Sequence, residues 1–560
     1  MNKYVQLTEE QIKNYALVEI EKILRQRGKS LRDYESMPYP DITYFAAPNN
    51  LLISDELNYD TVALAEEHDG LVSNLTDEQC GVYNTIMTVV DGNHGGVFFL
   101  YGHGGTGKTF LWRTLLAAIR SRGEIVLNVA SSAIAATLLP GGRTAHSRFV
   151  IPLNPEKDSS CNIKQESHLA ELIEKTRLIK WDEAPMMNKF CFEALDFTMR
   201  DLLNRTYTNP HAVNKPFGGK TVVFGGDYRQ ILPVIPGGTR QQIVHASLNS
   251  SYLWDNCKVL KLTKNMRLQN LPGDEEINAH KNFSEWILSI GDGVLGGPND
   301  GEISIKIPED MLIHNFTDPV KAIVSSTYPN FLSECHSPTY LNGRAILAPT
   351  LEDVRMVNEY MIGMNQSELK IIIYSSDSTC RSDDCDSELL RDIHTHEVLN
   401  SISASGVPSH ILNLKVGVPV MLMRNIDHSY GLCNGTRLII TRLGEHIIEA
   451  KVLTGISAGK EFLIPRLSPT PSYIRLPFTF QRRQFPLNVC FAMTINKSQG
   501  QTLSNIGGFL RRPVFTHGQL YVAVSRVTNR KGLKFVVCDD AGKPANMTIN
   551  VVYKEVFNNL

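Results

Sequence analysis

The chain has 560 residues, of which 42% are apolar and 20% are charged, and its formal net charge is −2. The apolar fraction excludes a mostly disordered or collagen-like chain, and the length predicts about three or four domains. The near-neutral charge excludes a protein that coats nucleic acid through net charge alone, but it is compatible with a local basic cleft.

Signals for metal sites, membranes and targeting are weak. The ten cysteines are scattered, and Cys380 and Cys385 lack a second pair at zinc-site spacing, so we expect reduced thiols of an intracellular protein. No apolar run approaches the ~18 residues of a membrane-spanning helix. The polar start of the chain resembles neither a signal peptide nor a transit peptide. We therefore expect no membrane partner.

Residues 1–73 predict a helical extension followed by a linker. Thr8 and Gln11 have the spacing of a capping box at the start of an amphipathic helix, and Gly28 is a plausible end. The two prolines within residues 37–40 exclude a continuous helix there and predict an extended segment. We interpret this region as a packing appendage.

From residue 75 to 259, short apolar runs alternate with helical stretches, which predicts a parallel sheet covered by helices. A second set of such runs follows, so the fold class is α/β with two such domains. The expected strands are residues 97–101, 125–130, 178–181 and 221–224, then 344–348, 489–494 and 533–537. Residues 436–467 alternate short strands with glycine turns and predict a small all-β insertion. The acidic stretch 375–386 predicts a surface loop.

A phosphate-binding loop follows the first expected strand. Residues 102–109, GHGGTGKT, fit G-x-x-x-x-G-K-[ST] and open a predicted helix. Glycines let backbone N–H groups turn toward phosphate oxygens, Lys108 supplies positive charge to the β and γ phosphates, and Thr109 offers a hydroxyl to Mg²⁺. The expected ATP-binding residues are Gly102, Gly104, Gly105, Thr106, Gly107, Lys108 and Thr109.

Polar residues at the ends of later strands complete this candidate site. Asp182 is expected to hold Mg²⁺ through water, and Glu183 to orient and deprotonate the attacking water. Gln230, in FGGDYRQ, can hydrogen-bond phosphate or that water. Arg267 and Arg526 are candidates to reach the phosphate, although most arginines are solvated surface residues. An arginine arriving from a facing domain would make hydrolysis depend on closure.

These motifs, in order, carry a family resemblance. GHGGTGKT, WDEA, FGGDYRQ, LTKNMR, TINKSQGQTL and QLYVAVSR make the chain resemble superfamily 1 helicases of the 5′→3′ branch. It is most similar to the PIF-one (petite integration frequency) DNA helicases, including the copies linked to Helitron transposons. Supporting segments are GGRTAHSRF, KPFGG, ILAPTLEDV and GLCNGTRL, so the resemblance covers nearly the whole chain.

The resemblance implies two RecA-like P-loop domains with parallel sheets. The implied divisions are an N-terminal extension at 1–73, a first domain at 74–265 with a wedge-like insertion near 150–170, a second domain at 266–435 and 480–560, and an SH3-like β insertion at 436–479. ATP is then expected to close the cleft by joining the Lys108 side to Arg267 and Arg526.

The resemblance also implies residue roles. Gln79 would bind adenine, because an amide presents both a donor and an acceptor. Gln230 matches the γ-phosphate sensor, and Arg267 and Arg526 match arginine fingers. The catalytic residues implied in this way are Glu183, Lys108, Gln230, Arg267 and Arg526, and the DNA-binding residues are Thr144, His146, Thr494, Lys497 and Gln499. At position 496 the chain departs from the family, because Asn496 stands where histidine is usual.

The implied function is that of an ATP- and Mg²⁺-dependent DNA helicase that moves 5′→3′ on single-stranded DNA and unwinds forked duplex DNA. A monomer or a DNA-induced oligomer is expected, in the nucleus rather than the mitochondrion, with roles in repair, recombination and telomere maintenance. Two alternatives stay open: an RNA or RNA–DNA helicase, and a transposon-derived P-loop protein that binds nucleic acid but unwinds nothing. A P-loop kinase would leave the KSQGQT and VSR segments unexplained.

Overall fold

The computed structural model describes most of the chain. The described residues are 10, 13–14, 16–17, 20–21, 30–34, 36–40, 50–204, 214–268, 273–335, 337–365, 370–379, 396–402, 407–427, 430–455, 457–468, 480–558 and 560. Most of the helix predicted between Thr8 and Gly28 lies outside them, as do Cys380 and Cys385. Within the described ranges, no helix is both long enough and apolar enough to cross a membrane.

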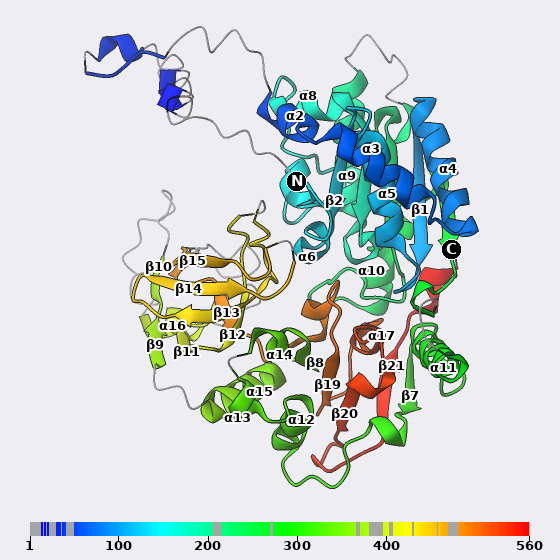
Figure 1. The fold of residues 1–560 in the computed structure, drawn as a ribbon, viewed down its shortest axis with the longest axis vertical. Coiled ribbons are helices and arrows are strands. Elements are labelled where there is room, and N and C mark those ends of the chain that lie inside the picture. Colours follow the sequence, from blue (N-terminus) through cyan, green and yellow to red (C-terminus); the bar gives the residue numbers. More distant parts are fainter. Residues whose placement is uncertain are drawn as a thin grey trace.

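A six-stranded, all-parallel sheet forms the centre of the first domain, in the order β3-β2-β4-β5-β1-β6 (Figure 1). Its strands are β1 (Gly96–Gly102), β2 (Ile125–Ala130), β3 (Arg143–Thr144), β4 (Thr176–Asp182), β5 (Thr221–Gly226) and β6 (Cys257–Leu262). Alternate residues of β1 face opposite sides, because side chains in a strand have a period of two. Phe98 and Leu100 therefore pack against α5 (Lys108–Arg120), and Phe99 packs in the core that contains α9 (Lys189–Asn204).

Further helices and an N-terminal arm surround this sheet. The helices are α4 (Asp77–Asp91), α6 (Ala133–Ala136), α7 (Ala145–Phe149), α8 (His168–Lys175) and α10 (Arg240–His245). The N-terminal arm consists of α2 (Leu51–Leu57), α3 (Thr61–Val72) and the residues that join them. Figure 1 shows α3 lying along α5 on the outside of the domain. The arm therefore packs on the helix that follows the phosphate-binding loop.

The second domain is built on a four-stranded parallel sheet in the order β18-β8-β19-β20. Its strands are β8 (Arg344–Ala348), β18 (Ala492–Thr494), β19 (Asn505–Leu510) and β20 (Leu533–Val537), and its helices include α11 (Asp274–Gly291), α12 (Pro319–Thr327), α13 (Phe331–Glu334), α14 (Pro338–Asn342), α15 (Leu351–Met364) and α17 (Gln519–Ser525). The antiparallel pair β7 (Glu302–Lys306) and β21 (Met547–Val551) lies beside α17. Leu347 and Tyr521 share one apolar core with Trp181 and Phe224 of the first domain, so the two domains are packed together.

An antiparallel β domain stands beside both of them (Figure 1). Its five-stranded sheet, in the order β15-β14-β13-β12-β17, contains β12 (Pro419–Leu422), β13 (Arg437–Arg442), β14 (Ile447–Val452), β15 (Glu461–Pro465) and β17 (Leu487–Val489). The predicted insertion at 436–479 thus contains only three of these strands. The sheet extends further because β12 pairs with the other edge of β13, and an unpaired edge would leave backbone groups exposed.

Two ribbons and a helix complete the β domain. They are β9 (Lys370–Tyr374) with β11 (Ile411–Lys415), β10 (Ser376–Thr379) with β16 (Phe480–Arg483), and α16 (His396–Ser401). The loop predicted at 375–386 is therefore wrong over 376–379, where the chain forms a strand with Asp377 buried. The rest of that prediction lies outside the described residues.

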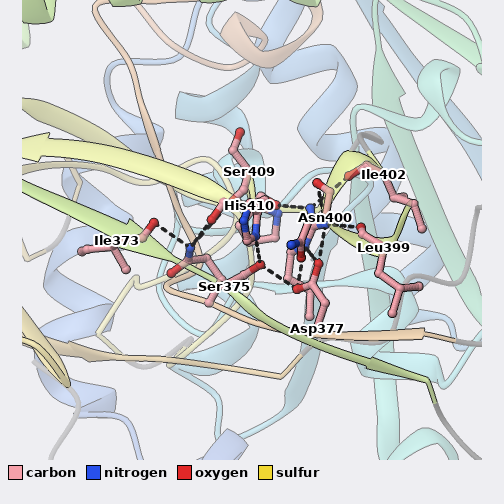
Figure 2. Close-up of polar contacts among 11 residues, drawn as sticks. Ile373, Ser375, Asp377, Leu399, Asn400, Ile402, Ser409 and His410 are labelled. Atoms are coloured by element: carbon pink, nitrogen blue, oxygen red, sulfur yellow. Dashed lines mark hydrogen bonds and ion pairs between the residues drawn. The ribbon is translucent and has the colours of Figure 1, made fainter. Parts of the chain in front are cut away.

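A buried ion pair explains why Asp377 points inward. The Arg482 guanidinium donates to both carboxylate oxygens of Asp377 at 2.7–3.1 Å. Its remaining N–H groups donate to carbonyl oxygens near the end of α16, those of Leu399, Asn400, Ile402 and Pro408. Figure 2 shows the Ser375 hydroxyl between Asp377 and His410. In a catalytic Ser-His-Asp triad the imidazole lies between the hydroxyl and the carboxylate, whereas here the hydroxyl lies in the middle. We therefore interpret the Asp377–Arg482 pair and its neighbours as a structural cluster, which we call the latch.

Candidate nucleotide and nucleic-acid site

The phosphate-binding loop joins β1 to α5 and curls around the Lys108 ammonium. Gly105 and Gly107 have φ of 95° and 81°, values that favour glycine. Lys108 Nζ donates to the carbonyl oxygens of Gly102 and His103, and the Thr106 hydroxyl donates to that of His103. The loop and the start of α5 therefore form the anion-binding arrangement that the sequence predicts.

Gln79 lies directly against this loop. It closes a capping box at the start of α4, with its Oε1 accepting from the Thr76 N–H, and its Nε2 donates to the Thr106 carbonyl at 3.3 Å. The side chain is buried. Binding of adenine by Gln79 stays a prediction, and it requires these two hydrogen bonds to be exchanged for bonds to the base.

The two acids lie at the carboxyl end of β4, next to the loop. Burial raises the pKa of Asp182, but the charges of Lys180 and Lys108 outweigh it and hold this pKa below its usual value. Lys180 is fully buried, and its Nζ lies 3.2 Å from Asp182 Oδ2. Asp182 is therefore ionised, and its carboxylate oxygens together with the Thr109 hydroxyl are suitable ligands for a hard cation such as Mg²⁺. No cluster of three or more metal-ligating side chains occurs among the described residues.

Glu183 has the environment of a general base. Its backbone is left-handed, with φ of 52°, which is uncommon outside glycine. Burial, and then the charge of Asp182, raise its pKa to about 7, while Lys108 and Arg526 oppose this shift. A carboxylate with this pKa is matched to proton transfer near neutral pH.

The loop after β5 connects the two domains. Gln230 is buried, and its Oε1 accepts a hydrogen bond from Gln499 Nε2 of the second domain at 3.2 Å. The Tyr521 hydroxyl of α17 donates to Asp227 Oδ2 at 2.6 Å. Sequence reasoning missed Asp227 and Tyr521, although both lie within the motifs FGGDYRQ and QLYVAVSR that it singled out.

The two arginines approach the cleft from different sides. Arg526 follows α17 in the second domain, and its charge and that of Glu183 affect each other's pKa. Arg267 instead lies on the Lys108 side, because the Met266 N–H donates to the Gly105 carbonyl at 2.9 Å. The expectation that both arginines face Lys108 across the cleft is therefore corrected for Arg267. Strand β6 is the neighbour of β1, so the chain leaving it emerges beside the phosphate-binding loop.

The residues expected to contact DNA are spread over both domains. Thr144 ends β3, and His146 lies on α7, where burial lowers its pKa. Thr494 ends β18, and Lys497 donates to Asn434 Oδ1 at 3.3 Å. The fifth of these residues, Gln499, instead donates to Gln230 of the first domain. Their contacts with DNA stay predictions.

A groove of about 500 Å³ lies where the two RecA-like domains and the β domain meet. One wall is formed by residues 137–140 of the first domain and another by residues 500–503 of the second. Tyr430 and residues 454–455 of the β domain complete it. Of these residues, sequence reasoning assigned only Gly500, which it matched to the segment that couples DNA to nucleotide, although GLCNGTRL and TINKSQGQTL include residues of two of the three walls.

The fold and the cleft define a P-loop nucleotide-binding protein with two RecA-like domains. Comparison with known families then identifies it further. Residues 74–301 match the family model described as PIF1-like helicase, and residues 397–443 match that described as DNA helicase Pif1, 2B domain. Over residues 74–301, the chain is therefore similar to the PIF1-like helicases. The 2B match begins before the predicted β insertion at 436–479, in agreement with the larger β domain described above.

Individual proteins show the same similarity. The ATP-dependent DNA helicase PIF1 of Danio rerio is 24% identical over 487 residues, which cover 86% of this chain and 64% of that protein. The chain thus spans less than two thirds of that relative's length. A Bacteroides Pif1 helicase solved with ADP-AlF3 and ssDNA has a TM-score of 0.56 and 22% identity, covering 82% and 92% of the two chains.

A third relative is a solved structure described as two coordinating Pif1 helicases unwinding forked dsDNA. It also has a TM-score of 0.56 and 22% identity, and it covers 82% of this chain and 91% of its own. At these identities, the two solved structures show that the fold is shared.

Proposed function

We propose that this chain is an ATP-dependent DNA helicase that moves 5′→3′ on single-stranded DNA and unwinds duplex DNA. The observation that carries the proposal is that Gln230 of the first domain and Gln499 of the second share a hydrogen bond, while Glu183 and Arg526, also from the two domains, influence each other's pKa. A hydrolytic site divided in this way works only when the domains are correctly apposed. Domain movement and hydrolysis are thereby coupled.

In this proposal the chain's own residues divide the chemistry between them. The loop N–H groups and Lys108 bind the β and γ phosphates, and Glu183 accepts the proton of the attacking water. Arg526 stabilises the charge that develops in the transition state. Mg²⁺, when bound by Thr109 and Asp182, would neutralise phosphate charge. Domain closure, rather than substrate binding alone, would then set the rate of hydrolysis.

The nucleic-acid side of the proposal rests on the groove and on the Gln499–Gln230 contact. Gln499 is one of the residues predicted to contact DNA, and its hydrogen-bond partner Gln230 is the predicted γ-phosphate sensor. A shift of this segment on binding a strand would therefore reach the phosphate sensor through one hydrogen bond. The ssDNA and forked dsDNA in the solved Pif1 structures support these as partners.

We place the activity in the nucleus, in repair, recombination and telomere maintenance, by extension from the family resemblance. We also propose a monomer or a DNA-induced oligomer as the working form. The solved structure described as two coordinating Pif1 helicases supports the second of these. Sedimentation of the full chain with and without a forked oligonucleotide distinguishes the two forms.

The deciding experiment measures ATP hydrolysis by the full chain and by Glu183→Gln, with no nucleic acid, with single-stranded DNA and with RNA. Strong stimulation by DNA that is lost in Glu183→Gln supports the proposal, and unwinding of 5′-tailed but not 3′-tailed duplexes supports the polarity. Stimulation by RNA but not by DNA would show that RNA, rather than DNA, is the substrate. Hydrolysis that ignores both nucleic acids would refute a nucleic-acid motor.

A further inference from the structure

The N-terminal arm carries a buried acid that contacts the nucleic-acid side of the first domain. The arm lies before residue 74, where the PIF1-like helicase match begins. Its residue Glu56, on α2, is only 5% exposed. A buried carboxylate is stable only when it is paired, so its partners indicate what it does.

Two equally buried arginines of the first domain share this carboxylate. Arg148, on α7, donates to Glu56 Oε1, and Arg120, at the end of α5, has its Nη2 3.6 Å from Glu56 Oε2. Both arginines are 4% exposed. Glu56 therefore supplies the negative charge that keeps two guanidinium groups inside the protein and close to each other.

The two arginines hold the segment that leads into the predicted DNA contacts. Arg120 Nη1 donates to the Pro140 carbonyl at 3.0 Å, and its guanidinium stacks 4.1 Å from the centre of the Tyr59 ring. An added Cβ at Gly141, where φ is 72°, would lie 2.4 Å from the Tyr59 hydroxyl. The arm thus packs closely against the turn at residues 140–141.

This turn joins the two parts of the nucleic-acid side. Residues 137–140 before it form a wall of the groove, and Thr144 and His146 follow it. Arg148 lies on the same short helix as His146. The Glu56 carboxylate consequently connects the arm to the turn through Arg120 and to α7 through Arg148.

We propose that Glu56 is a positioning residue for single-stranded nucleic acid, which fixes residues 138–149 in their binding conformation through Arg120 and Arg148. This inference rests on the proposed function for the identity of its ligand, and on the contacts of Glu56 with Arg120 and Arg148 for its geometry. The arm is then a working part of the binding site rather than a packing appendage.

The chain offers a matched control on the same arm. Glu67, on α3, pairs with Arg113 of α5 and so also links the arm to the first domain. This pair is partly exposed and lies away from residues 138–149 in sequence. Glu67→Gln makes the same chemical change as Glu56→Gln without touching the proposed linkage.

The test uses the full chain and a fluorescent poly-dT oligonucleotide. Its Kd is measured by anisotropy at several salt concentrations, together with hydrogen exchange of residues 138–149 without DNA. We expect Glu56→Gln to weaken binding about fivefold, within the range for residues that act through others, and to speed this exchange. Glu67→Gln should change neither quantity. Glu56→Asp, which keeps the charge, should fold even if Glu56→Gln does not, and should shift both readouts in the same direction by less.

Several outcomes would overturn the inference. Unchanged Kd and exchange in Glu56→Gln, with normal binding by the parent chain, would overturn it and leave the proposed function intact. Tighter binding with a steeper salt dependence would show that Glu56 merely repels phosphates. A Kd for ADP that rises as much as that for DNA would show general loosening of the domain. A parent chain that binds no oligonucleotide would remove the proposed function and this inference with it.

Discussion

The hydrogen bond between Tyr521 and Asp227 ties the helix before Arg526 to the loop that carries Gln230. Asp227 is fully buried, and its Oδ2 accepts from the Tyr521 hydroxyl at 2.6 Å. Burial, and then the charge of Asp227, raise the pKa of Tyr521 well above its usual value, so the hydroxyl keeps the proton that it donates. Tyr521→Phe removes this donor and leaves the ring in place.

The structure sets the size of the expected effect. A hydrogen bond to a charged group contributes about 1.5–3 kcal/mol, because its loss leaves a buried acceptor without its donor. In the variant, Asp227 Oδ1 still accepts a hydrogen bond from the Arg229 backbone N–H at 3.1 Å, so the carboxylate is not left without any donor. We therefore expect a free-energy cost in the lower half of this range. Since 1.4 kcal/mol corresponds to about tenfold, a loss of about 1.5–2.2 kcal/mol should lower kcat for DNA-stimulated ATP hydrolysis roughly 10- to 40-fold.

A matched variant separates this effect from the loss of any buried hydroxyl. Tyr328 is as buried as Tyr521 and lies in the same domain, but it donates to the neutral Phe491 carbonyl at 2.8 Å, away from the cleft. Tyr328→Phe should leave kcat near the parent value. Steady-state hydrolysis with saturating DNA measures both variants. Equal kcat for Tyr521→Phe and the parent would refute the coupling argument, as would equal losses in the two variants.

Three further results are expected. DNA-stimulated hydrolysis should fall as pH is lowered through about 7, because only ionised Glu183 accepts a proton; a rate that is flat from about pH 8 to 6 would contradict this. Gly107→Ala should weaken binding of a fluorescent ATP analogue about tenfold or more, because its Cβ would lie 2.3 Å from Gln79 Nε2 in strained backbone; unaltered affinity would argue against the loop geometry. Arg482→Met should leave Asp377 buried without its cation and reduce protection of β10 from hydrogen exchange by about 3–5 kcal/mol; full protection would show that the latch is dispensable.

The parts of the fold that were predicted from sequence depend on local patterns. The apolar runs at 97–101 and 125–130 lie within buried strands because a central parallel strand is covered on both faces. Strand β6 was missed because CKVLKL interleaves lysines with apolar residues at the edge of the sheet. Strand β19, NIGGFL, was missed because paired glycines are typical of turns rather than strands.

In the candidate nucleotide site too, residues within local motifs could be predicted from the sequence, whereas contacts between distant residues could not. Lys108, Asp182 and Glu183 could be assigned because their motifs combine residue type, spacing and a preceding strand. The Tyr521–Asp227 bond joins residues 294 positions apart, and the Glu56–Arg148 pair joins residues 92 apart. No local pattern encodes such pairs, because they are decided by how the elements pack.

The position of Arg267 on the phosphate-binding loop gives the two arginines different thermodynamic roles. Arg267 is attached to the first domain through the Met266–Gly105 hydrogen bond, so it can contact ATP whether or not the domains are apposed. We therefore expect Arg267 to contribute mainly to ground-state affinity for ATP. Arg526 belongs to the second domain, so we expect it to reach the nucleotide only when that domain does and to contribute mainly to the transition state. If the chain hydrolyses ATP as proposed, loss of Arg267 should therefore raise KM for ATP, whereas loss of Arg526 should lower kcat.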